Sequence, residues 1–309
     1  MAIVIASDIQ NIQPWISALK NADPLVEVIT IDKVIDNSDV EFILAWNYLH
    51  GLLGKYPRLK TVASMGAGVD HILKDPDLPE KVKIVRLVDP RLSQDMYEFI
   101  LAVIMNRLRS LTRYRENQMT GLWKKTLYGR ISDVNIGVMG TGAIGNHIAS
   151  RLQAAGFSVS GWRRTAEAPG SYKMYYGNDQ LKSFISKADV LICLLPLTPE
   201  TEGILNKQNM QMLPENSWIV NLGRGGHLVE EDLIELLDSG HLGGANLDVF
   251  REEPLPTGHP FWHHKKIFIT PHIASLPDPA SVAPQILENY RNTIENGILK
   301  NTVDRKKGY

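Results

Sequence analysis

A glycine-rich segment in the middle of the chain has the spacing of a phosphate-binding turn. Gly140, Gly142 and Gly145 follow an apolar run and precede a segment with helical periodicity. In a strand–turn–helix unit the first glycine permits the tight turn, the second lets the backbone approach a pyrophosphate, and the third allows close packing. The helix N-terminus adds N–H groups and a positive dipole end. We expect a dinucleotide here, although the glycines could serve only to shape a turn. The expected contacts are Gly140, Thr141, Gly142, Ala143, Ile144 and Gly145.

The next expected strand ends in arginines, at a place where NAD-binding units commonly carry an acidic residue. That acid stands about 20 residues after the glycines and binds the ribose 2′-hydroxyl. This chain instead has Trp162, Arg163, Arg164 and Thr165, with no carboxylate. Two guanidinium groups and a hydroxyl suit a 2′-phosphate. The segment predicts NADPH, with NADH less favoured, and a solvated surface pair is the alternative.

Three later apolar runs each end in side chains capable of binding or acid–base chemistry. Arg224 lies between glycines after the first run, Asp248 and Glu253 follow the second, and His272 follows the third. Ligands of open α/β sheets bind beyond the carboxyl ends of the strands, so we expect these groups to converge near the cofactor. Further expected cofactor contacts near the strand ends are Leu195, Pro196, Thr201, Leu222, Gly223, Ala274 and Ser275.

The elements that must position these groups follow a strand–helix alternation. In the second half, strands are expected at residues 134–139, 157–161, 190–195, 217–222, 244–249 and 266–269, with helices at 142–155 and 181–186. This pattern predicts a doubly wound parallel sheet. Shorter β-like runs in the first ninety residues predict a smaller α/β unit. A long helix is expected from Asp95 to about Arg115, and another at residues 281–298.

Composition excludes several classes of protein. The chain has 309 residues, 44% hydrophobic and 22% charged, which predicts a globular protein of two domains. A formal net charge of −1 leaves no global basic field for nucleic acid or an anionic membrane. No apolar run approaches the roughly 20 residues of a membrane span, and the N-terminus does not resemble an export signal. The single cysteine, Cys193, lies in an apolar run, so we expect a buried thiol and a cytoplasmic setting.

Three histidines superficially resemble a metal-binding cluster. His259, His263 and His264 are separated by proline, phenylalanine and tryptophan residues. That composition favours a surface loop, and we expect no metal.

The chain resembles the D-isomer-specific 2-hydroxyacid dehydrogenases. The glycine loop and residues 221–225, 247–256 and 270–274 match motifs of that family in order and spacing. The likeness covers nearly the whole chain and is loosest in the first sixty residues. It implies two Rossmann-like domains, in which a doubly wound cofactor domain is inserted in a smaller flavodoxin-like substrate domain.

The resemblance also places the domain boundaries. Residues 1–92 and 278–309 would form the substrate domain, and residues 93–277 the dinucleotide-binding domain. A homodimer is implied, and the long apolar helix from Asp95 agrees with it.

The catalytic roles follow from the same resemblance. It implies that Arg224 grips a 2-oxo acid, that Glu253 hydrogen-bonds His272, and that His272 is the acid–base group. Asp248 would lie beside the nicotinamide carboxamide. The chemistry independently favours this set, because hydride delivery to a ketone leaves a developing alkoxide that needs a proton donor within reach. A neighbouring carboxylate favours the imidazolium, and arginine is a permanent planar cation for a carboxylate.

Residues 65–71 resemble the family's substrate-carboxylate loop. Backbone N–H groups of Gly66, Ala67, Gly68 and Val69 would hold the carboxylate, and the glycines would allow close approach. Trp46 would form a wall that limits the substrate to two or three carbons; a simple core role is the alternative.

Trp46, residues 162–164 and the ending 303–309 bring the resemblance closest to the members that reduce glyoxylate and hydroxypyruvate. We therefore expect a small 2-oxo acid as substrate: glyoxylate reduced to glycolate and hydroxypyruvate to D-glycerate, using NADPH. One alternative is a reductase of a longer or branched 2-keto acid. Another is a non-catalytic dinucleotide sensor, which need not keep the arginine, glutamate and histidine together.

Overall fold

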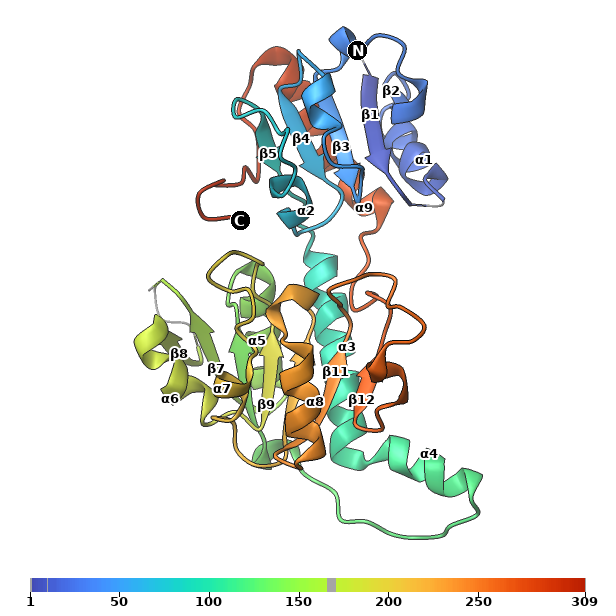
Figure 1. Ribbon diagram of the computed structural model, residues 1–309. Coiled ribbons are helices and arrows are strands. Elements are labelled where there is room, and N and C mark those ends of the chain that lie inside the picture. Colours follow the sequence, from blue (N-terminus) through green and yellow to red (C-terminus); the bar gives the residue numbers. More distant parts are fainter. Residues whose placement is uncertain (1, 10, 166–170, 309) are drawn as a thin grey trace. The chain divides into compact units, whose positions relative to one another are not determined.

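The computed structural model describes residues 2–9, 11–165 and 171–308 (Figure 1). Tyr309, the last residue of the segment used for the resemblance, lies outside this part of the chain. The protein divides into two compact units, residues 1–91 with 277–309 and residues 92–276. Below, they are called unit 1 and unit 2.

Unit 1 is built on a five-stranded sheet in the order β2-β1-β3-β4-β5, and every neighbouring pair is parallel. Its strands are β1 (Ala2–Ser7), β2 (Glu27–Thr30), β3 (Phe42–Trp46), β4 (Thr61–Ser64) and β5 (Lys83–Val85), and its helices are α1 (Gln13–Ala22), α2 (Asp70–Leu73) and α9 (Pro279–Glu295). Asp278 caps α9 by accepting the N–H of Ala280, and Pro279 occupies the first turn, where no N–H is required.

Unit 2 is built on a seven-stranded parallel sheet in the order β12-β11-β10-β9-β6-β7-β8. Its strands are β6 (Asn135–Met139), β7 (Ser158–Arg163), β8 (Lys173–Tyr176), β9 (Val190–Cys193), β10 (Ser217–Asn221), β11 (Leu242–Leu247) and β12 (Ile267–Ile269). The chain winds in one direction from β6 to β8 and in the other from β9 to β12. The crevice beyond β6 and β9 is therefore the switch point at which such sheets bind ligands.

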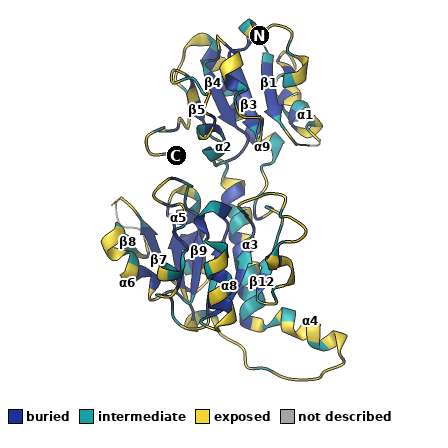
Figure 2. Ribbon diagram, viewed as in Figure 1, coloured by how far each residue is buried: buried dark blue, intermediate teal, exposed yellow. Residues whose placement is uncertain are grey.

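The helices of unit 2 lie beside this sheet, except the one at residues 111–119, which extends away from it (Figure 1). They are α3 (Pro90–Arg109), α4 (Leu111–Met119), α5 (Ala143–Ala154), α6 (Leu181–Ile185), α7 (Lys207–Met210) and α8 (Glu230–Asp238). The strands of both units are largely buried, whereas α4 and the segment after it are exposed (Figure 2). Cys193 is buried in unit 2, and burial raises the pKa of its thiol to about 12.

The structure corrects two expectations about elements and adds two elements that were not predicted. The helix expected from Asp95 to Arg115 begins at Pro90 and is broken at Ser110, whose backbone is left-handed at φ 52°. Strand β7 runs two residues beyond Gly161, to Arg163. Strand β8 and helix α8 were not predicted, although Leu233, Leu236 and Leu237 of α8 have helical spacing and are buried.

Candidate active site

The glycine turn joins β6 to α5 at the switch point of unit 2. Gly140 has φ 95°, and a Cβ there would lie 2.7 Å from the carbonyl oxygen of Leu194. A Cβ on Gly145 would lie 1.9 Å from the carbonyl oxygen of Gly140. Both positions exclude a side chain, so the turn packs tightly against the end of β9 and the start of α5.

The same turn is open where a ligand would approach. A Cβ on Gly142 would meet nothing within 4 Å, and Gly142 and Ala143 are exposed at the start of α5. The hydroxyl oxygen of Thr141 is buried and has no hydrogen-bond partner in the described part of the chain. An open glycine backbone, a helix N-terminus and an unsatisfied hydroxyl fit the pyrophosphate of a dinucleotide.

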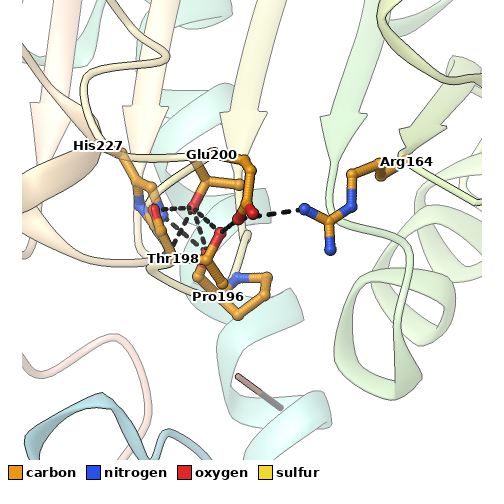
Figure 3. A network of polar contacts seen from close by, with 6 residues as sticks. Arg164, Pro196, Thr198, Glu200 and His227 are labelled. Atoms are coloured by element: carbon orange, nitrogen blue, oxygen red, sulfur yellow. Dashed lines mark hydrogen bonds and ion pairs between the residues drawn. The ribbon is translucent and has the colours of Figure 1, made fainter. Parts of the chain in front are cut away.

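Arginine side chains follow at the end of the neighbouring strand, β7. Arg164 is exposed, and its guanidinium lies 3.2 Å from the carboxylate of Glu200 (Figure 3). Glu200 also accepts the hydroxyl of Thr198 at 2.8 Å, and this bond, with the positive charge of Arg164, holds the pKa of Glu200 below its ordinary value. Arg164 therefore has an anionic partner that a phosphate could replace.

The histidine beyond β12 is paired with a carboxylate. Nδ1 of His272 lies 2.8 Å from Oε2 of Glu253, and Oε1 of Glu253 accepts the N–H of Phe250 at 2.8 Å. About a third of each side chain of the pair is exposed, so it is accessible without being fully solvated. A carboxylate bonded to Nδ1 fixes the orientation of the ring.

The positive charge of Arg224 also acts on the carboxylate of this pair, through the pKa of Glu253. Burial disfavours the charge of Glu253, but the hydrogen bond from His272 opposes it. The N–H of Phe250 and the positive charges of His272 and Arg224 act in the same direction, so the pKa of Glu253 lies below its ordinary value. The carboxylate is charged at neutral pH.

The loop that carries His272 is anchored by Asp248, at the end of β11. The buried carboxylate of Asp248 accepts the hydroxyl of Thr270 at 2.6 Å and the N–H groups of Ile273 and Ala274 at 2.9 Å each. The N–H of His272 donates to the carbonyl oxygen of Asp248 at 2.9 Å. His272 has φ 54°, a conformation that these bonds on both sides maintain. In this structure Asp248 holds the histidine loop in place. The resemblance implies in addition a contact with the nicotinamide carboxamide.

The loop that carries Arg224 packs closely against the glutamate loop. A Cβ on Gly225 would lie 1.9 Å from the carbonyl carbon of Phe250, so no other residue type fits there. Nη1 of Arg224 donates to the carbonyl oxygen of Gly223 at 2.7 Å. The main chain of Arg224 is bonded to Asn221, which begins the 221–225 motif, and to His227, a functional candidate that no motif in the sequence indicated.

Several side chains expected to contact the cofactor are engaged elsewhere. The indole of Trp162 is buried and donates to the carbonyl oxygen of Gly177 at 2.9 Å, because β7 extends past Gly161 and turns this residue inward. Thr201 donates to the carbonyl oxygen of Pro196 at 2.7 Å, and Ser275 donates to that of Leu92 at 3.0 Å. In this structure each of these three side chains donates to a main-chain carbonyl oxygen of the protein.

In unit 1, Trp46 and the 65–71 loop lie at the carboxyl ends of the adjacent strands β3 and β4. A Cβ on Gly66 would lie 2.6 Å from Cζ3 of Trp46, and the rings of Trp46 and His71 are 4.9 Å apart. The N–H of Gly66 donates to Oγ of Ser64 at 3.1 Å, which corrects the expectation that it faces the substrate. Gly66 instead provides space for the indole.

The next three residues of that loop keep their backbone donors available. Ala67, Gly68 and Val69 form no hydrogen bond through N–H within the described ranges. Consecutive unpaired N–H groups suit an anionic group such as a carboxylate.

The histidine-rich segment is tied to acidic side chains. His259 lies 3.1 Å from Glu230, and His264 lies 3.4 Å from Asp238. Among the residues that the structure describes, no group of three His, Cys, Asp or Glu could hold a metal ion. No helix among them is long and apolar enough to cross a membrane.

Comparison with known proteins agrees with the family resemblance. Residues 101–274 match the model of the D-isomer specific 2-hydroxyacid dehydrogenase NAD-binding domain. A glyoxylate/hydroxypyruvate reductase A of Photorhabdus laumondii is 35% identical, with both chains covered completely.

Two solved structures extend the likeness to three dimensions. A D-isomer specific 2-hydroxyacid dehydrogenase from Xanthobacter autotrophicus, in complex with NADPH and MES, has a TM-score of 0.93 and 36% identity over 100% of this chain and 99% of that one. An NADPH-dependent glyoxylate/hydroxypyruvate reductase from Sinorhizobium meliloti, in complex with NADP and sulfate, has a TM-score of 0.92 and 34% identity over the same shares. With its strand-end residues, motifs and fold all in agreement, the chain belongs to the D-isomer specific 2-hydroxyacid dehydrogenase family.

Proposed function

We propose that this protein reduces glyoxylate to glycolate and hydroxypyruvate to D-glycerate with NADPH. The observation that carries the proposal is the His272–Glu253 pair, 2.8 Å apart, with the charge of Arg224 acting on the same carboxylate. These three side chains come from the ends of β10, β11 and β12, in the sheet whose switch point holds the glycine turn. The relatives that reduce these acids or carry NADPH support the choice of substrate and cofactor.

The residues divide the chemistry between them. When bound, NADPH supplies a hydride to the carbonyl carbon of the 2-oxo acid. Arg224 binds the substrate carboxylate and polarises the carbonyl. His272 donates a proton to the carbonyl oxygen, and anionic Glu253 stabilises the imidazolium before transfer. The product is a 2-hydroxy acid, in which carbon has gained the hydride and oxygen the proton.

In unit 1, we assign the carboxylate-binding role to the N–H groups of Ala67, Gly68 and Val69 and the size limit to Trp46. The indole packs on Gly66, so its position is fixed by the loop itself. A fixed bulky wall disfavours a substrate with a long or branched chain.

A panel of 2-oxo acids tests the proposed substrate class. With NADPH, glyoxylate and hydroxypyruvate are expected to have a higher kcat/KM than pyruvate, 2-oxobutyrate or a branched 2-keto acid. A bulky acid with the highest value would favour the alternative enzyme. Absence of turnover with every acid, together with tight NADPH binding, would favour a dinucleotide sensor.

The protonation of His272 predicts a pH dependence. Reduction requires a proton on His272, so kcat/KM is expected to fall toward alkaline pH. The pKa of Glu253 lies below its ordinary value, so its charge persists at alkaline pH. Glu253→Gln removes that charge and should move the decline to lower pH. Steady-state rates from about pH 6 to about pH 10 measure this, and a flat alkaline profile would contradict it.

Arg164 predicts the preference for NADPH. Arg164→Ala removes a charge-assisted contact to the 2′-phosphate and should raise KM for NADPH about 10- to 100-fold, leaving KM for NADH nearly unchanged. Glu200→Gln is the matched control, because it removes the carboxylate now paired with Arg164 and should lower KM for NADPH. Equal effects on both cofactors would argue against a 2′-phosphate site.

We propose a homodimer in the cytoplasm. Helix α4 and the segment after it carry apolar side chains that are exposed, among them Trp123 at 94% and Leu127 at 100%. Large apolar side chains that are exposed on one segment suit contact with a second copy of the chain. The buried thiol of Cys193 agrees with a reducing compartment.

The dimer is tested with Trp123→Arg combined with Leu127→Asp. Light scattering after size exclusion is expected to show a dimer for the wild type and a monomer for this variant. Trp262→Arg, at an apolar residue outside this segment, should remain dimeric. A monomeric wild-type protein at micromolar concentration would contradict the proposal.

A further inference from the structure

His227 is a fully buried histidine to which the mechanism above assigns no part. It ends a 3₁₀ turn, η6 (Gly225–His227), that begins directly after Arg224. Its Nδ1 accepts the N–H of Arg224 at 3.1 Å, and its Nε2 lies 3.2 Å from the carbonyl oxygen of Pro196. Figure 3 shows the ring at one end of a network that includes Pro196, Thr198 and Glu200.

These bonds determine the protonation of the ring. A backbone N–H can only donate, so Nδ1 must carry its lone pair and the proton must be on Nε2. Nε2–H then donates to the carbonyl oxygen of Pro196. His227 is therefore a neutral ring with both nitrogens satisfied, and it bridges the loop after β10 to the loop after β9.

The space around the ring leaves it little freedom. A Cβ on Gly223 would lie 3.0 Å from Nδ1 and Cε1 of His227, so the ring packs against the main chain that leads into Arg224. The main-chain N–H of His227 also donates to the carbonyl oxygen of Arg224 at 3.2 Å. The main chain of Arg224 is thus held by His227 through both its N–H and its carbonyl group.

We propose that His227 is a positioning residue with two separable tasks: Nδ1 sets the main chain of Arg224 for the substrate, and Nε2 sets Pro196 for the cofactor. This rests on the proposed function, in which Arg224 binds the 2-oxo acid, and on the sequence-based prediction that Pro196 contacts the cofactor. A small displacement of a positioned group is costly in such a site. The two tasks belong to different atoms, so they can be removed one at a time.

Two amide substitutions separate the tasks. His227→Asn places an oxygen near the position of Nδ1 and keeps an acceptor for the N–H of Arg224, but it does not reach Pro196. His227→Gln places an NH₂ group near the position of Nε2 and keeps the donor to Pro196, but it offers no acceptor to Arg224. We expect the asparagine variant to raise KM for NADPH about tenfold, with KM for the 2-oxo acid within about threefold of wild type. The glutamine variant should show the reverse.

Controls distinguish positioning from a loss of stability. His259→Asn, at a partly buried histidine bonded to Glu230, should change neither KM. General destabilisation would change both constants together in both amide variants, and that result, or no change in either constant, would overturn the proposal.

A measurement on the wild-type protein applies even if neither amide variant folds. The ¹⁵N spectrum of labelled histidine, with the His227 signal assigned by coupling to the amide of Arg224, should show a neutral ring protonated on Nε2. An imidazolium, or a proton on Nδ1, would overturn the proposal. This spectrum needs no turnover, so a wild-type enzyme that reduced no 2-oxo acid would contradict the proposed function alone.

Discussion

Replacement of His272 by alanine is expected to lower kcat/KM for glyoxylate with NADPH by about 10²- to 10⁴-fold. Nδ1 of His272 is bonded to Glu253 at 2.8 Å, so we assign the transferred proton to Nε2. Without the imidazole, water must protonate the developing alkoxide, and water is neither charged nor held in place. The loss should appear mainly in kcat, because the missing interaction is strongest in the transition state.

The fold should survive this change. The loop is held through main-chain bonds to Asp248, which do not involve the imidazole. Thermal unfolding and NADPH affinity, measured by fluorescence, are therefore expected to stay close to wild type. His272→Gln is the control for shape, and it should be nearly as slow as the alanine variant. Activity within threefold of wild type in either variant would contradict the assigned role.

Arg224→Ala is expected to raise KM for glyoxylate and to lower kcat/KM by about 10²- to 10³-fold. The arginine is assigned as a permanent cation at the substrate carboxylate, and loss of one member of a charged, hydrogen-bonded pair costs roughly 2–5 kcal/mol. Arg224→Lys keeps the charge and loses the planar fork, so it should recover part of the loss.

The measurement is a steady-state comparison of the three proteins at saturating NADPH. NADPH affinity should change little, because the glycine turn and Arg164 are untouched. An unchanged KM for glyoxylate in Arg224→Ala would remove the arginine from the substrate site. A large loss of NADPH affinity would move it to the cofactor site instead.

Local patterns in the sequence were sufficient to predict much of this architecture. Buried parallel strands such as β9 and β10 are continuous apolar runs, and the glycine motif marks both the end of β6 and the start of α5. Arg224 and His272 could be placed at one edge of the sheet because parallel strands end on the same side.

Features that depend on tertiary partners could not be predicted. The break at Ser110 and the direction of the Trp162 indole follow from contacts made by the folded chain, and not from apolar periodicity. His227 gave no signal because its partner, Pro196, is 31 residues away in the sequence and bonds through its main chain. The N–H of Gly66 donates to the Ser64 hydroxyl, a bond that the glycine spacing in the sequence does not reveal.

In the proposed reaction, a hydride from NADPH and a proton from His272 reach the same carbonyl group. The most direct test is to follow deuterium from NADPH labelled at C4 of the nicotinamide during reduction of hydroxypyruvate in ordinary water. D-glycerate with one deuterium at C2 is expected from one of the two stereospecifically labelled forms. Glycerate without deuterium from either form, or no glycerate at all, would contradict the proposed reaction.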